Sequence, residues 1–175
     1  MKKSRNYFYA VFLLFVLSAL FGYIFPVFFV EFIKKFVEEI VGKTRGMNFF
    51  QLFIFIFSNN IITAFFAVLF GIIFVFPLFL AFFNGYVLGF VSNKVAGSFG
   101  YSILLRLLPH GIFEIPALII SLGLGLRLGI SLFLKNPGKS LVYNLKNSLR
   151  VFVYIILPLL IIAGIIEAGL MFLLK

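Results

Sequence analysis

Long uncharged apolar runs alternate with short polar or basic segments along the chain. The first run, 7–30, holds no charged residue, and as a helix it would reach roughly 36 Å, more than a hydrocarbon core of ~30 Å. Two later runs of spanning length cover 99–126 and 151–174. Such runs predict transmembrane helices, because a soluble surface helix carries its apolar residues on one face.

The uncharged run 49–91 is too long for one span, since a single helix would measure roughly 65 Å. A turn near Gly71 leaves two spanning lengths, 49–70 and 72–91. A turn at 58–60 would instead leave a short first piece that is interfacial or re-entrant. We favour the turn at Gly71, which predicts a tight helical hairpin and about five spans in all.

Segment 31–41 differs from these runs because it is amphipathic. Its apolar side chains recur with helical spacing, and charged side chains occupy the opposite face. We expect this helix to lie parallel to the membrane in the headgroup layer. The alternative is an extramembrane helix packed on the bundle. The charged residues are Glu31, Lys34, Lys35, Glu38 and Glu39.

The composition agrees with a membrane protein. Hydrophobic residues make up 63% of the chain and charged residues 11%, against about 45–50% and 25% in soluble domains. We predict one integral membrane domain, 1–175, with an all-α, polytopic helical bundle. A signal peptide is the other reading of the first run, but 7–30 exceeds a usual signal core and lacks a convincing cleavage site, so we interpret it as a retained span.

The net charge of +10 comes from 15 Lys and Arg against five acidic residues. The cations are scattered beside apolar segments, which argues against nucleic acid and favours the lipid bilayer, with its anionic headgroups, as partner. They concentrate at the N-terminus and within 127–150. The positive-inside rule therefore predicts a multi-pass protein of the cell membrane with a cytoplasmic N-terminus.

Several polar residues interrupt the predicted spans at matching depth. A turn near Gly71 brings the asparagines of the hairpin to mid-membrane, level with polar residues of 99–126. Because an unpartnered polar group in lipid costs several kcal/mol, these side chains should point inward and bond one another. The predicted midplane cluster comprises Asn59, Asn60, Asn84, Arg106, His110, Glu114 and Glu167.

The span 99–126 also contains Pro109, Gly111 and Pro116. Proline removes an amide donor and clashes with the preceding turn, so these residues predict a broken or kinked helix. Many transporters build a midplane site beside such a break. The alternative is a kink with purely structural polar contacts, because membrane helices tolerate proline when neighbours satisfy the freed groups.

Little in the sequence points to catalysis or to a bound cofactor. The chain has no Cys and one His, which leaves His110 and Glu114 short of ligands for a metal site. No Ser lies in a nucleophile elbow, so we expect no enzymatic activity and no cofactor. Gly85 and Gly89 permit close helix approach, and we rank packing within one subunit above a homo-oligomer seam.

One motif resembles a known family. Residues 109–117 read Pro-His-Gly-x-x-Glu-x-Pro-Ala, preceded by Asn59 with Asn60 and by Asn84 with Gly85. Over roughly 49–129 the chain resembles the stage II sporulation protein M family. The resemblance implies a polytopic helical membrane protein. In spore formers the namesake acts in the membrane with two peptidoglycan-degrading partners.

Two functions therefore remain open. The resemblance favours a membrane scaffold that anchors envelope partner proteins. The interrupted span favours a permease or channel-like component with a polar site at His110 and Glu114.

Overall fold

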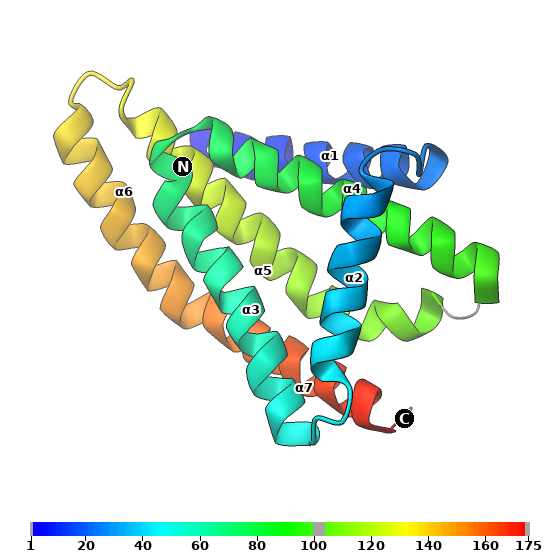
Figure 1. Cartoon of the computed structure of the whole chain (residues 1–175). Coiled ribbons are helices and arrows are strands. Elements are labelled where there is room, and N and C mark those ends of the chain that lie inside the picture. Colours follow the sequence, from blue (N-terminus) through cyan, green and yellow to red (C-terminus); the bar gives the residue numbers. More distant parts are fainter. Residues whose placement is uncertain (1, 100–103, 174–175) are drawn as a thin grey trace.

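The computed structural model describes residues 2–99 and 104–173, with side chains described in these ranges except at 2–5, 95, 98–99 and 104–110. The described chain consists of helices joined by short turns and contains no strand, which confirms the predicted all-α class. Figure 1 shows the arrangement of the helices. In chain order they are α1 Lys2–Ile24, α2 Val30–Thr44, α3 Phe49–Leu69, the 3-10 turn η1 Phe70–Ile72, α4 Val75–Phe99, α5 Leu104–Ser131, α6 Pro137–Val151, the π-helical segment η3 Phe152–Ile156 and α7 Leu157–Leu173.

Five helical segments of the described chain are long and apolar enough to cross a membrane. Large apolar side chains such as Leu13, Phe50 and Phe79 are exposed on their outer faces, as lipid contact requires. The chain is therefore a multi-pass membrane protein. The segments are Asn6–Ile24, Phe49–Ile72, Val75–Lys94, Gly111–Ser131 and Pro137–Leu173.

The first span ends earlier than the predicted 7–30. Helix α1 stops at Ile24, and the chain turns before α2 begins at Val30. Pro26 explains the difference, because proline cannot donate to the helix ladder and disfavours helical geometry in the residue before it. Phe29, the last residue of the turn, takes a left-handed conformation with φ 56°.

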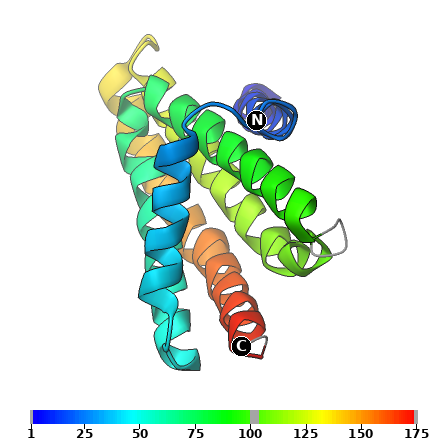
Figure 2. The ribbon, with the colours of Figure 1, turned by 45° about the vertical axis from the view of Figure 1, so that its right-hand side comes forward.

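The run 49–91 reverses at Gly71, which lies in η1 between α3 and α4. The predicted tight hairpin is wrong, however, because α4 packs mainly along α1 and touches α3 little. Figure 2, which views α1 nearly end-on, shows α4 passing beside it. The long apolar run is thus two spans with different neighbours.

Glycines create the contact between α1 and α4. A methyl group on Gly85 would overlap the carbonyl oxygen of Phe15, and one on Gly89 would overlap that of Ala19. On the other helix, a methyl group on Gly22 would meet the carbonyl oxygen of Tyr86. The two backbones therefore touch, which confirms close packing within one subunit.

Helix α5 lies at the centre and packs against α1, α3, α4, α6 and α7. It remains one helix from Leu104 to Ser131, past the predicted end at 126. Pro109 and Pro116 therefore do not break it, and Pro116 is exposed at the helix surface. A bend of its axis at these residues stays a prediction.

The last span belongs to a longer helical rod. Helix begins at Pro137 instead of 151 and continues to Leu173, with the π-helical segment Phe152–Ile156 inside it. The 37 residues would extend roughly 55 Å, well beyond a hydrocarbon core. The π segment comes just before Pro158, where such a bulge relieves the clash of a proline ring with the preceding turn.

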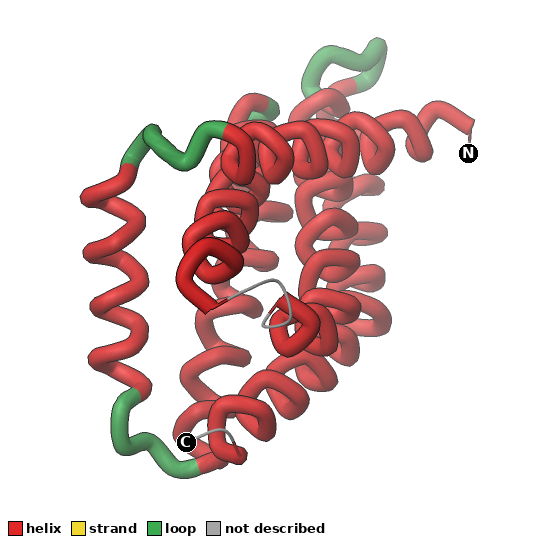
Figure 3. The backbone as a smooth tube through the Cα atoms, turned by 90° about the vertical axis from the view of Figure 1, so that its right-hand side faces the viewer, coloured by secondary structure: helices red, strands yellow, loops and turns green. Residues whose placement is uncertain are grey.

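Helix α2 runs alongside the bundle and opposite in direction to α3 (Figures 1 and 3). The amphipathic helix is confirmed, with Val30–Thr44 as its bounds. Its one buried apolar side chain is Ile33, which packs against Tyr86 and Phe90 of α4. Its depth relative to a bilayer stays a prediction. A short loop then leads to α3, whose first turn is closed by reciprocal side-chain to backbone bonds between Asn48 and Gln51.

Candidate functional site

A polar pocket of about 210 Å³ lies between α2, α3, α4, α5 and α7. Its polar side chains come from three of these helices, and α2 and α7 contribute apolar ones. Polar groups from different spans converge here. The lining residues are Phe36, Ile40, Asn59, Asn60, Thr63, Ala64, Asn84, Glu114, Leu118 and Leu160.

Helix α3 supplies three of the polar residues. Asn59 and Asn60 follow each other, and Thr63 lies one turn beyond Asn59, so the three share one side of the helix. The Thr63 hydroxyl donates a hydrogen bond of 2.9 Å to the Asn59 carbonyl oxygen. This bond uses the single hydroxyl proton and fixes the side chain against its own helix.

Helix α4 contributes Asn84. Its Nδ2 donates a hydrogen bond of 2.9 Å to the Leu80 carbonyl oxygen one turn earlier. The next residue, Gly85, touches the backbone of α1. The contact between α1 and α4 therefore sets the position of Asn84 in the pocket.

Helix α5 contributes Glu114, which is half-buried. Glu167 of α7 does not line the pocket, yet its carboxyl group lies close enough to interact electrostatically with that of Glu114. Both residues belong to apolar spans. Any negative charge near the pocket is thus concentrated on the side formed by α5 and α7.

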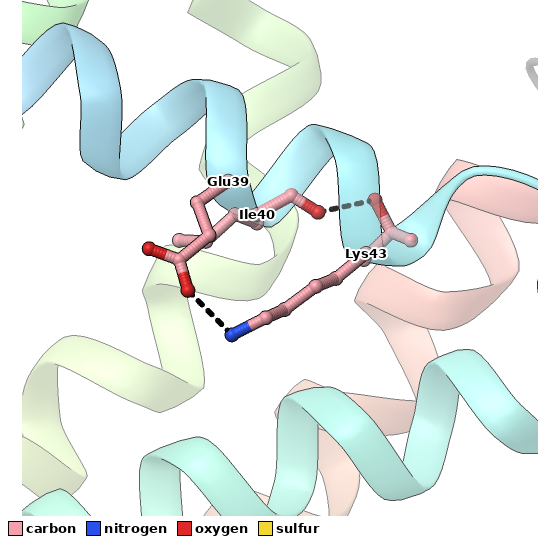
Figure 4. Close-up of polar contacts among 4 residues, drawn as sticks. Glu39, Ile40 and Lys43 are labelled. Carbon is pink, nitrogen blue, oxygen red and sulfur yellow. Dashed lines mark hydrogen bonds and ion pairs between the residues drawn. The ribbon is translucent and has the colours of Figure 1, made fainter.

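Helix α2 covers the pocket with apolar side chains. Phe36 and Ile40, one turn apart, both line it. Two ion pairs form along α2: Lys43 Nζ lies 2.6 Å from Glu39 Oε1 (Figure 4), and Lys34 Nζ lies 3.8 Å from Glu31 Oε1. Part of the apolar face of 31–41 therefore meets protein, while Phe32, Val37 and Val41 stay exposed.

The structure brings four of the seven predicted cluster residues to one pocket: Asn59, Asn60, Asn84 and Glu114. Glu167 lies nearby, while the side chains of Arg106 and His110 lie outside the described part of the chain. The expected bonding among cluster members is not found, because no hydrogen bond joins Glu114 to an asparagine among the described side chains.

The predicted helix-break residues are part of α5. The side chain of Pro109 is outside the described residues, and Gly111 and Pro116 occupy ordinary helical positions. No group of three or more His, Cys, Asp or Glu side chains that would hold a metal ion occurs among the described residues.

The sequence interpretation missed Thr63, Phe36 and Ile40. Thr63 had a usable signal, since it follows Asn59 at a spacing of four and so shares its face. The two residues of α2 had none, because the pattern of an amphipathic helix does not reveal whether its apolar face meets lipid or protein.

Comparison with known proteins extends the family resemblance. An uncharacterized protein of Methanocaldococcus jannaschii is 37% identical over 124 residues, which cover 67% of this chain and 54% of that protein. The chain thus spans about half the length of this relative. No solved structure matches the chain.

The family model described as stage II sporulation protein M matches residues 11–170. This match includes all the described polar residues that line the pocket, and it covers all or most of each segment of spanning length. The chain belongs to the stage II sporulation protein M family.

Proposed function

We propose that this membrane protein binds a small polar solute or ion in the polar pocket and acts as a permease or channel-like component. The observation that supports the proposal is the convergence of Asn59, Asn60, Asn84 and Glu114 on one pocket inside an apolar bundle. Neither catalysis nor a cofactor is part of it.

The hydrogen bonding of the pocket favours a site over a structural cluster. Polar side chains in an apolar environment cost free energy unless they are bonded, so a purely structural cluster should satisfy itself. Here Thr63 and Asn84 bond to carbonyl groups of their own helices. The pocket therefore keeps hydrogen-bonding capacity for water or a guest.

Water access tests the proposal directly. The chain contains no Cys, so single-cysteine variants need no background removal. We expect Thr63→Cys to react with a small, water-soluble thiol reagent. Ser121→Cys is the matched control, because Ser121 is fully buried in α5. If Thr63→Cys is as unreactive as the control, the pocket is dry and the proposal fails.

Replacement of Glu114 separates a working site from a structural one. In a structural cluster, Glu114→Leu would strip partners and cost about 1–3 kcal/mol. In a site kept for binding, stability is not the selected property, so we expect Glu114→Leu and Glu114→Gln to unfold at the wild-type temperature or above it. A loss of stability in Glu114→Leu alone would favour the structural role.

A scaffold for envelope proteins is the second candidate. Family membership supports it, together with the charged outer face of α2, where Lys35 and Glu38 are exposed. A photo-crosslinking residue in place of Glu38 should then capture a defined partner in cells. The same residue in place of the lipid-facing Leu13 is the control. Equal crosslinking at both positions would argue against a scaffold.

We further propose that the N-terminus is cytoplasmic, as the distribution of Lys and Arg indicates. Labelling of single-cysteine variants in intact cells tests it. Lys2→Cys and Lys139→Cys should both resist a membrane-impermeant reagent until the membrane is opened. If either reacts from outside, the orientation or the number of spans is wrong.

A further inference from the structure

Two hydrogen bonds within helices leave Thr63 and Asn84 with oxygen atoms that can accept from, or coordinate, a guest in the polar pocket. Thr63 has one hydroxyl proton, and it is committed to the Asn59 carbonyl oxygen at 2.9 Å. Asn84 commits an amide N–H to the Leu80 carbonyl oxygen at 2.9 Å. That bond also fixes which end of the Asn84 amide carries nitrogen, since a carbonyl accepts only from a donor.

Every described polar side chain of the lining offers an oxygen atom to a guest. Thr63 retains the lone pairs of its hydroxyl oxygen, and Asn84 retains Oδ1, for which the described residues provide no donor. Glu114 adds a carboxylate, which in its ionised form only accepts. Asn59 and Asn60 each add an amide oxygen, and their amide NH2 groups can donate to water or to the carboxylate.

The charge of the pocket points the same way. Among the side chains that the structure describes, those that line the pocket include no Lys, Arg or His. The nearby Glu167 would add negative charge and not balance that of Glu114. A carboxylate in apolar surroundings needs a counter-charge or a proton. A cationic guest would supply the counter-charge, and the oxygen atoms of the pocket would coordinate it.

We propose that the polar pocket is a binding site for a small monovalent cation, coordinated by Glu114 and by neutral oxygens of Thr63 and Asn84. Oxygen ligands suit hard cations, whereas soft transition metals prefer sulfur and nitrogen. One lining carboxylate balances one positive charge, and divalent sites use more. A volume of about 210 Å³ leaves room for water on the ion. This inference rests on the proposed function of the pocket.

The experiment compares thermal unfolding of the purified chain in sodium, potassium and choline chloride at equal ionic strength. Choline is too large for the coordination proposed. We expect sodium or potassium to raise the melting temperature above that in choline, with saturation as the concentration rises. Thr63→Val and Glu114→Gln should lose this increase.

Thr44→Val is the matched control. Thr44 is buried, and its hydroxyl donates 2.9 Å to the Ile40 carbonyl oxygen, the same bond that Thr63 makes, but it does not line the pocket. It should keep the cation response. If the wild type shows no cation-specific increase, or if Thr63→Val keeps it, the inference is overturned.

Thiol labelling keeps this result distinct from the proposed function. A reactive Thr63→Cys without any cation response means that the pocket is open and serves a solute other than a cation. A cation response with an unreactive Thr63→Cys means a closed ion site, which supports the inference and contradicts solute passage. An unreactive Thr63→Cys together with no cation response rejects both the proposed function and this inference.

Discussion

Helix α2 and the contact between α1 and α4 are opposite extremes of packing in one molecule. Three glycines let the backbones of α1 and α4 touch. Gly22 of α1 contacts the backbone of α4, and Gly85 and Gly89 of α4 contact the backbone of α1. Helix α2 rests on the bundle through one buried apolar side chain, Ile33. The extended backbone contact holds α1 and α4 together, whereas the single side chain Ile33 holds α2 on the bundle only weakly.

This difference suits the two regions to different tasks. The α1 and α4 pair holds Asn84 in place, since Gly85 is the next residue in the chain. Helix α2 covers the pocket with Phe36 and Ile40. Positive-φ residues, Phe29 and Gly46, adjoin the two ends of this helix. A weakly held cover over a rigid polar pocket is the arrangement that access to the pocket requires.

The largest expected effect is at Gly89. In Gly89→Ala the new methyl group would overlap the Ala19 carbonyl oxygen and lie 2.7 Å from the Tyr23 amide nitrogen. Backbone atoms cannot yield as side chains do, so we expect a loss of about 3 kcal/mol. Unfolding in detergent measures it.

Gly97→Ala is the matched control, on the same helix and with no atom of the described residues within 4 Å of the added methyl group. It should be neutral or gain ~0.5–1 kcal/mol, because alanine is the better helix former. If both variants lose the same stability, the close contact between α1 and α4 does not hold the fold together.

Next in size is Ile33→Ala. Removal of a buried Ile costs at least about 2 kcal/mol where the surroundings cannot collapse. Because Ile33 is the buried apolar contact of α2, we expect the loss to appear as faster amide exchange along α2, with α1 and α4 unchanged. Val37→Ala, at an exposed position of the same helix, should change nothing. If amide exchange in α1 also becomes faster, α2 and the α1 and α4 pair are not independently stable.

Tyr86 connects the two regions, and Tyr86→Phe should have a smaller effect. Its hydroxyl accepts from the Phe28 amide at 2.9 Å and reaches the carbonyl oxygens of Phe25 and Phe28 at 3.0 and 3.1 Å. Loss of these bonds at the turn between α1 and α2 should cost about 1–2 kcal/mol. Exchange should rise at 25–33 first. Tyr154→Phe, at an exposed site, is the control, and an equal effect there would exclude the role.

The convergence of polar residues from different spans was predictable from the sequence. A turn at Gly71 and a hydrocarbon thickness of ~30 Å predict that Asn59, Asn60 and Asn84 lie at one level with Glu114. The four residues line one pocket, and their depth in a bilayer stays a prediction. Their functional role stays a prediction.

Helix pairing was not predictable in the same way. In lipid, the inner and the outer faces of a span are both apolar, so periodicity does not tell which neighbour a helix meets. The α4 helix therefore looked like the partner of α3, although it packs on α1. Pro26 and Pro158 changed helix boundaries through local geometry, and an apolar count does not contain that information.

The smallest expected effect is at the exposed ion pair of α2. Lys43 donates a hydrogen bond to Glu39 and holds the pKa of that carboxyl below its ordinary value. A lowered pKa means that the pair contributes fully above the ordinary pKa and that the contribution is lost as the pH falls through the lower, folded-state value.

Glu39→Gln should therefore leave the melting temperature unchanged at neutral pH, because exposed pairs contribute little. It should still speed amide exchange in the last turn of α2, where α2 lacks buried apolar support. Well below about pH 4, variant and wild type should converge, since the wild-type carboxyl is then protonated. Glu38→Gln, one position away and in no ion pair among the described residues, controls for the charge alone. Equal exchange in both variants at neutral pH would show that this pair does not hold α2 together.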